Sequence, residues 1–151
     1  MKNSFQIAGI IVLVFILGAC KTASSSITKQ TDGITEKYWK LVEINGKPVV
    51  WGDDTKREPH IILKDEGNRV IGNGGCNTLS GSYEIDRAAN RIKFSQMAST
   101  MMACLNMEIE DELKRALEMA DNYSLSSDGK FLSLNRARMA PLARFEVVYL
   151  R

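Results

Sequence analysis

The chain has 151 residues, with 20 basic and 18 acidic side chains and a formal net charge of +2 at pH 7. This length leaves room for one domain beside a targeting segment, and the evenly mixed charge argues against a nucleic-acid-binding protein, which needs clustered positive charge. A hydrophobic fraction of 44% and two tryptophans argue against a disordered protein.

The N-terminal segment has the pattern of a lipoprotein signal peptide. Lys2 supplies a positive charge, and the apolar run 7–17 is too short to span a bilayer. The run ends in Leu-Gly-Ala-Cys at 17–20, which resembles the lipobox cleaved by the lipoprotein signal peptidase. The alternative is an ordinary secretory signal that happens to end in a cysteine. We expect a signal peptide at 1–19 and lipidation of the Cys20 thiol.

Lipidation at Cys20 predicts an exported protein held at a membrane of the cell envelope by several acyl chains. The next residue is Lys21 rather than the aspartate of inner-membrane retention signals, so the outer membrane is expected, with either face left open. Residues 20–35 are rich in Ser, Thr and Lys and are interpreted as a lipidated, flexible tether that reaches about 20 Å by random-coil scaling. The folded domain is then expected at 36–151.

This domain shows short apolar–polar alternations separated by turn residues, a pattern that predicts strands. The turn Asn45-Gly46 predicts a type I′ hairpin into a short strand at 47–50. The other expected strands are 38–44, 60–64, 69–72, 81–86, 91–94, 123–126, 131–134 and 143–149. A polar loop is expected at 51–59, and the basic turn region 136–141 has no assigned role.

One amphipathic helix is expected after 91–94. Its apolar stripe, at i, i+3/i+4 and i+7 spacing, consists of Ile109, Leu113, Ala116, Leu117 and Ala120. We expect Asn106 to cap the helix, Asn122 to end it, and Glu110–Lys114 and Asp111–Arg115 to form i,i+4 ion pairs. Together these elements predict an α+β fold: a curved antiparallel β-sheet or open barrel of about eight strands with one helix packed on it.

Two stretches carry the remaining cysteines: the glycine-rich segment 72–83 and the segment 97–104. With Cys20 lipidated, Cys76 and Cys104 form an even pair in an oxidising compartment, where a disulfide would stabilise the fold by about 3.5 kcal/mol on the chain-entropy model. A redox pair of the CxxC kind needs adjacency, and a zinc site needs four ligands, of which only His60 could join the two thiols. We therefore expect a disulfide between Cys76 and Cys104, with two buried, reduced thiols as the alternative.

No catalytic, metal or cofactor site is expected. His60 is the one histidine, and no Gly-x-Ser-x-Gly elbow accompanies it, so a strand-end position is its simplest interpretation. Soft sulfur ligands can hold Cu(I), but the methionine spacing favours gap-filling between sheet and helix. These methionines are Met97, Met101, Met102 and Met107.

Taken together, the residues resemble the META domain of the HslJ-like envelope lipoproteins over about 38–149. The resemblance rests on Trp39-Lys40-Leu41, Asn45-Gly46, Gly75-Cys76-Asn77, Gly81, Tyr83, Phe94, Met97-Ala98, Thr100-Met101-Met102-Ala103-Cys104 and Met107-Glu108. The resemblance implies a small α+β fold in an envelope lipoprotein associated with stress or drug tolerance. No enzymatic activity is established for the family that could be carried over to this chain. The residues given a structural motif role are Gly75, Cys76, Asn77, Gly81, Tyr83, Thr100, Met102 and Cys104.

The function expected from these observations is a non-enzymatic, lipid-anchored binding or structural module with an envelope protein as partner. The alternative is a carrier of a lipid or small apolar ligand in the mouth of an open barrel, lined by residues such as Leu113 and Leu117. A protease-inhibitor-like or chaperone role through the loop 51–59 is a third hypothesis. The oligomeric state is left open.

Overall fold

The computed structural model describes residues 33–50, 52 and 57–149. The chain divides into two units, Met1–Gln30 and Thr31–Arg151, and all described residues belong to the second. The signal peptide at 1–19, the lipidation site Cys20 and most of the tether therefore lie outside the described residues. Among the described residues, no helix has both the length and the apolar character that a membrane crossing requires.

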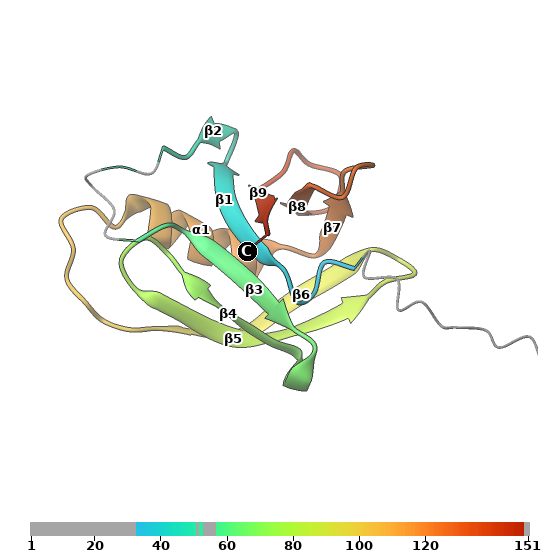
Figure 1. Cartoon of the computed structure of the whole chain (residues 1–151), viewed down its shortest axis with the longest axis horizontal. Helices are drawn as coiled ribbons and strands as arrows, with labels where there is room; N and C mark the ends of the chain where they lie inside the picture. The colour runs from blue at the N-terminus through green and yellow to red at the C-terminus, as the bar shows by residue number, and fades with distance from the viewer. Residues whose placement is uncertain (1–32, 51, 53–56, 150–151) are drawn as a thin grey trace, which may run out of the picture. The chain divides into compact units, whose positions relative to one another are not determined.

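The strands and the helix follow one another along the chain largely in the order that the sequence predicts (Figure 1). The strands before the helix are β1 (Tyr38–Ile44), β2 (Lys47–Pro48), β3 (His60–Lys64), β4 (Arg69–Asn73), β5 (Thr78–Asp86) and β6 (Arg91–Ser99), with a short 3-10 turn η1 (Glu66–Asn68). The helix α1 (Glu108–Met119) is followed by β7 (Asn122–Leu125), β8 (Phe131–Asn135) and β9 (Ala143–Val148). The predicted type I′ hairpin is present, with Asn45 at φ 49° and Gly46 at φ 78°.

Eight strands form a closed antiparallel barrel, and β2 is a short extension that pairs with β1 alone. The order is β1–β3–β4–β5–β6–β7–β8–β9, and pairing of β9 with β1 closes the ring. The junction between β6 and β7 is the weakest, since their register contains the single pair Arg91–Asn122. The predicted barrel of about eight strands with one helix is confirmed, and its ring is closed rather than open.

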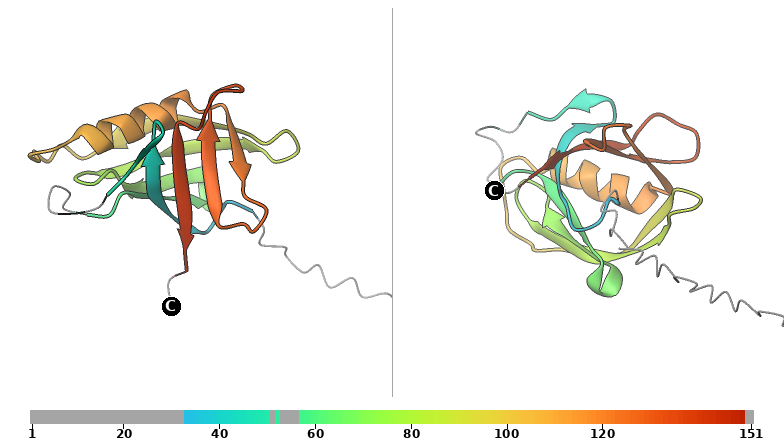
Figure 2. Two further views of the ribbon diagram at one scale, coloured as in Figure 1. Left: turned by 90° about the horizontal axis from the view of Figure 1, so that it is seen from above. Right: turned by 45° about the vertical axis from the view of Figure 1, so that its right-hand side comes forward.

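The helix fills the barrel with its apolar stripe. Leu113, Ala116 and Leu117 are buried with inward side chains of the strands, and α1 packs against β6, β1 and β8. In the right-hand view of Figure 2, α1 lies within the outline of the strands. Burial of this stripe against a closed sheet is what holds a 12-residue helix that would be marginal alone.

Several details at α1 differ from expectation. The helix ends at Met119, and Asn122 is the first residue of β7 rather than the stop of the helix. Asp111 pairs with Lys114 instead of Arg115. The N-cap is Met107, and the Glu108 N–H donates to Asn106 Oδ1 (3.0 Å), so Asn106 acts from one position before the cap. Lys114 contacts Asp111 at 3.5 Å rather than Glu110, because Glu110 is buried and points toward other residues.

The core also includes Ile34, which the sequence placed in the tether. Its side chain is 2% exposed, and its carbonyl oxygen accepts a 2.7 Å hydrogen bond from Trp39 Nε1. Glu36 N–H donates to the Leu63 carbonyl (2.8 Å), so the chain joins the barrel near the last residues of β3. Ordered packing therefore begins at least two residues before the predicted start at Glu36.

Candidate functional site

The two cysteine-bearing segments meet at one end of β3. Cys76 and Cys104 form a disulfide with a Cα–Cα distance of 6.3 Å, which joins the turn after β4 to the segment after β6. Asn73 pairs with His60, the first residue of β3, so this junction lies at the opposite end of β3 from Leu63, where the chain enters. We call residues 73–77 and 100–107 the linked loops.

Asn77 holds the linked loops together with its side-chain amide. Its Oδ1 accepts hydrogen bonds from the Met102 N–H (2.7 Å) and the Thr100 hydroxyl (2.7 Å), and its Nδ2 donates to the Met102 carbonyl (3.2 Å). Both backbone groups of Met102 are thereby satisfied by one side chain, as a neighbouring strand would satisfy them. Thr100 adds a second contact, because its Oγ1 accepts the Thr78 N–H (3.2 Å).

Glu110, a residue of α1, holds the linked loop 73–77 from the side of the helix. It is buried at 1% exposure, and its Oε2 accepts the Asn77 N–H at 2.7 Å. A Cβ at Gly74 would lie 2.9 Å from the Glu110 Cβ, so glycine is what lets the helix approach this closely. Asn73 Oδ1 accepts the Gly75 N–H (2.8 Å), and Gly75 itself has φ 116°. The loop backbone is therefore held from two sides.

Sequence reasoning missed Glu110 as a site residue, although a signal for it exists. Glu110 stands three and seven residues before Leu113 and Leu117, so it falls on the same helical stripe as the buried leucines. An acidic residue on an apolar stripe indicates a buried contact.

The predicted motif residues divide into two groups. Gly75, Cys76, Asn77, Thr100, Met102 and Cys104 come together in the linked loops. Gly81 and Tyr83 lie farther along β5: Gly81 faces a bulge where β6 carries an extra residue, and a Cβ there would meet the Ser95 carbonyl at 3.0 Å. Tyr83 is buried and its hydroxyl donates to the Lys64 carbonyl (3.1 Å). These two residues shape the barrel rather than the loops.

The linked loops expose large apolar side chains. Met101 is 99% exposed, Leu105 is fully exposed and Met102 is 42% exposed. In Figure 1 the segment before α1 lies at the left, whereas the first described residues, in cyan, lie at the right, in agreement with the positions along β3. The domain thus carries exposed apolar groups at the end away from its N-terminal entry.

The histidine and methionine side chains that were considered for catalysis or metal binding make structural contacts. His60 stacks on Tyr38 with ring centroids 4.3 Å apart, and its Nδ1 is 2.8 Å from the Glu58 carbonyl. Met97 is partly buried in the core, and the Met107 Sδ lies 3.9 Å from Asn77 Nδ2. In the part of the chain that the structure describes, no group of three His, Cys, Asp or Glu side chains is placed to hold a metal ion.

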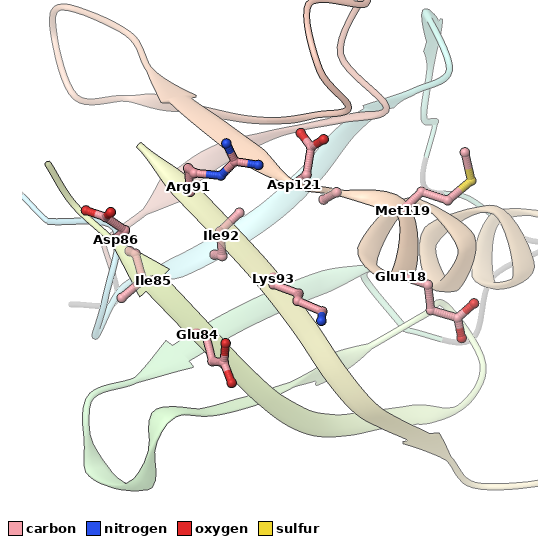
Figure 3. Close-up of a pocket in the computed structure, with 10 residues that line it drawn as sticks. Glu84, Ile85, Asp86, Arg91, Ile92, Lys93, Glu118, Met119 and Asp121 are labelled. Carbon is pink, nitrogen blue, oxygen red and sulfur yellow. The ribbon is translucent and has the colours of Figure 1, made fainter. Parts of the chain in front are cut away.

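A separate pocket of about 530 Å³ lies between the β5–β6 hairpin and the C-terminal end of α1 (Figure 3). Its apolar lining consists of Ile85, Ile92, Met119 and Ala120. Its charged lining consists of Glu84, Asp86, Arg91, Lys93, Glu118 and Asp121. Sequence reasoning did not find this pocket, because the hairpin and the helix end meet only in the folded domain.

Two of these carboxylates already have partners in the fold. Asp121 accepts hydrogen bonds from the Ala137 N–H (2.8 Å) and from Asn122 Nδ2 (2.7 Å), and these bonds lower its pKa. Asp86 accepts from the Ala88 and Ala89 N–H groups in the hairpin turn. No hydrogen bond or ion pair between described side chains involves Glu84 or Glu118.

The domain resembles two solved structures at low sequence identity. One is the NMR structure of a protein from Burkholderia xenovorans, with a TM-score of 0.57 and 20% identity over 76% of this chain and 83% of that one. The other is the crystal structure of a DUF4847 family protein from Bacteroides vulgatus, with a TM-score of 0.53 and 16% identity over 75% and 93% of the two chains. At these identities the likeness concerns the fold alone.

No curated protein shows significant sequence similarity to this chain. The family model of the META domain, however, matches residues 32–149, which include Ile34, the whole barrel and the linked loops. The resemblance drawn from the two cysteine-bearing segments is thereby confirmed, and the chain belongs to the META domain family.

Proposed function

We propose that this protein is a lipid-anchored, non-enzymatic module of the cell envelope that binds a protein partner through the linked loops. The lipobox sequence at 17–20 supports the anchor. Export to an oxidising compartment agrees with the disulfide between Cys76 and Cys104.

The observation that carries the proposal is the contrast within 100–107 between a restrained backbone and exposed side chains. The disulfide and the Asn77 bonds restrain the backbone, while Met101 and Leu105 are almost completely exposed. Single exposed apolar residues are ordinary, but two on one restrained loop give a preorganised contact surface that loses little entropy on binding. Methionine also adapts its shape to an apolar partner surface.

The carrier alternative gains no support at the positions that would line its cavity. Leu113 and Leu117 are both 0% exposed within the core cluster, so they pack against strands instead of facing a space for cargo. The third hypothesis depends on the loop 51–59, and residues 51 and 53–56 of that loop lie outside the described residues.

Co-purification tests the proposal. The full-length chain is expressed in its own cells, extracted in mild detergent and compared with a Met101→Ser, Leu105→Ser double variant. We expect one partner at fixed stoichiometry with the wild type and at least a fivefold loss of that partner with the double variant. Both changes are on exposed side chains, so thermal stability should be unchanged.

Glu146→Gln serves as the matched control, since Glu146 is an exposed side chain on the barrel wall, in β9. It should retain the partner at the wild-type level. An identical set of co-purified proteins with wild type and double variant would overturn the proposal that the linked loops bind a partner.

A further inference from the structure

We propose that Cys104 is a modification site, at which a low-molecular-weight thiol exchanges with the disulfide and forms a mixed disulfide. Cys76 is then the buried leaving group that stays within the folded domain. The inference concerns the domain by itself and does not depend on the partner proposed above. Three observations carry it: the unequal burial of the two cysteines, the hydrogen-bond acceptor beside Cys76, and the bonds that join the linked loops without the disulfide.

The two cysteines of the disulfide differ in burial. Cys76 is 2% exposed, whereas Cys104 is only partly buried and lies between the exposed residues Ala103 and Leu105. Exchange requires the attacking thiolate to approach one sulfur of the bond, so access decides which sulfur is attacked. A thiolate from solvent therefore attacks Cys104 Sγ, and the burial of Cys76 protects the other sulfur.

The exchange is a balanced substitution at sulfur. The thiolate forms a new S–S bond with Cys104 Sγ, and the bond between Cys104 and Cys76 breaks. The electron pair of the broken bond leaves with Cys76 Sγ as a thiolate, which takes up a proton from water. The attacking sulfur is oxidised and Cys76 Sγ is reduced, so the step needs no further oxidant or reductant.

The thiol that this step leaves on Cys76 has a hydrogen-bond acceptor already in place. Cys76 Sγ lies 3.6 Å from the Met102 carbonyl oxygen, a distance at which a thiol can donate to it. Asn77 Nδ2 donates to the same oxygen at 3.2 Å and fixes its position. A carbonyl oxygen has two lone pairs and can accept from both groups. A disulfide sulfur has no hydrogen to donate, so this acceptor serves Cys76 only after the exchange.

Hydrogen bonds other than the disulfide also join the linked loops. Asn77 Oδ1 accepts from the Met102 N–H and from the Thr100 hydroxyl, both at 2.7 Å. These bonds involve neither cysteine, so they remain when the S–S bond opens. The two cysteines then stay close together, and the Cys76 thiolate can attack Cys104 Sγ, release the small thiol and re-form the disulfide. The modification is therefore reversible without unfolding of the barrel.

Two matched full-length variants test which cysteine is reactive. The variant Cys20→Ser, Cys76→Ser keeps only the thiol of Cys104, and the variant Cys20→Ser, Cys104→Ser keeps only that of Cys76. Both lack the disulfide, so they lose the same cross-link. The thiol reagent DTNB measures the rate of each thiol. We expect Cys104 to react at least tenfold faster than Cys76 in the folded chain, and the two rates to agree within about twofold in urea.

The oxidised wild-type chain gives a second measurement that does not depend on the stability of these variants. It is incubated with reduced glutathione as the small thiol, quenched with acidic N-ethylmaleimide and analysed by peptide mass spectrometry. We expect glutathione on Cys104 and the maleimide on Cys76. Glutathione found equally on both cysteines, mainly on Cys76, or only when the chain is in urea would overturn the proposal. Equal DTNB rates of the two folded variants would overturn it as well.

Discussion

At the scale of single residues, Asn77 has the largest effect on the site. Its side-chain amide hydrogen-bonds to both backbone groups of Met102, as a neighbouring strand would. Its backbone N–H donates to the buried carboxylate of Glu110. A leucine or alanine at this position would remove three part-buried hydrogen bonds, two to the backbone of Met102 and one to the Thr100 hydroxyl. Each such bond contributes about 1 kcal/mol to stability.

Asn77→Ala should therefore lower the free energy of unfolding by about 2–3 kcal/mol, from the loss of three side-chain hydrogen bonds. Urea unfolding of the oxidised chain measures this change. The matched control is Asn106→Ala, which removes one exposed hydrogen bond to the Glu108 N–H and should cost less than about 1 kcal/mol. Equal effects of the two variants would contradict the bridging role of Asn77.

Tyr38 provides a pH-dependent test of the region around Glu58. Burial and the nearby Glu58 carboxylate raise the pKa of Tyr38 from 10.0 to about 12. Because the folded-state pKa is the higher one, the associated stability is present below pH 10.0 and is lost as the pH rises toward 12.

The absorbance of tyrosinate should accordingly rise later in the folded chain than in urea. Tyr38→Phe should remove part of the late-titrating signal and flatten the loss of stability between pH 10 and 12. A variant with the same pH dependence as the wild type would show that Tyr38 is not shielded.

At the scale of elements, the disulfide connects two segments that the sheet does not pair. Cys76 and Cys104 are 28 residues apart, and the bond holds the segment before α1 against the turn after β4. Without it, the contacts made by Asn77 would have to hold the linked loops alone.

A Cys76→Ser, Cys104→Ser double variant should lose about 3.5 kcal/mol of stability by the chain-entropy estimate. Amide hydrogen exchange should also accelerate at 100–107. In β8 and β9, exchange should accelerate only as much as the loss of global stability accounts for. Uniform acceleration in all elements would contradict a local role of the disulfide in ordering the linked loops.

Much of this element structure follows from local sequence. Alternation predicts β1, β3, β8 and β9, and the Asn45-Gly46 turn predicts the first hairpin, because backbone geometry and one-sided burial act over a few residues. The extension of β5 and β6 to Thr78 and Ser99 was missed. Glycine and small polar residues carry little strand signal there, and pairing with the neighbouring strand decides the conformation.

Contacts between distant segments account for the rest. Closure of β1 on β9, the burial of Glu110 beneath Gly74 and the charged pocket all depend on residues far apart in the sequence. Local spacing predicts an i,i+4 pair of Glu110 with Lys114, because it cannot show that the Asn77 N–H donates to the Glu110 carboxylate.

At the scale of the whole molecule, the chain combines an anchor expected at Cys20 with a proposed contact surface in the linked loops. The full chain should appear in the membrane fraction with the mass of the segment from Cys20 plus its acyl groups. Cys20→Ser should abolish the added mass and release the chain from that fraction, unless it is retained as an uncleaved precursor. Membrane association and acylated mass that persist in the variant would contradict lipidation at this residue.

The most direct test of the account is site-specific photo-crosslinking of the full-length chain in living cells. A photoreactive amino acid is placed at Met101 or Leu105 in the linked loops, and at Glu146 on the barrel wall as the control. We predict one discrete adduct from both loop positions and none from the control. Adducts of equal yield from all three positions, or from the control alone, would contradict binding of a partner through the linked loops.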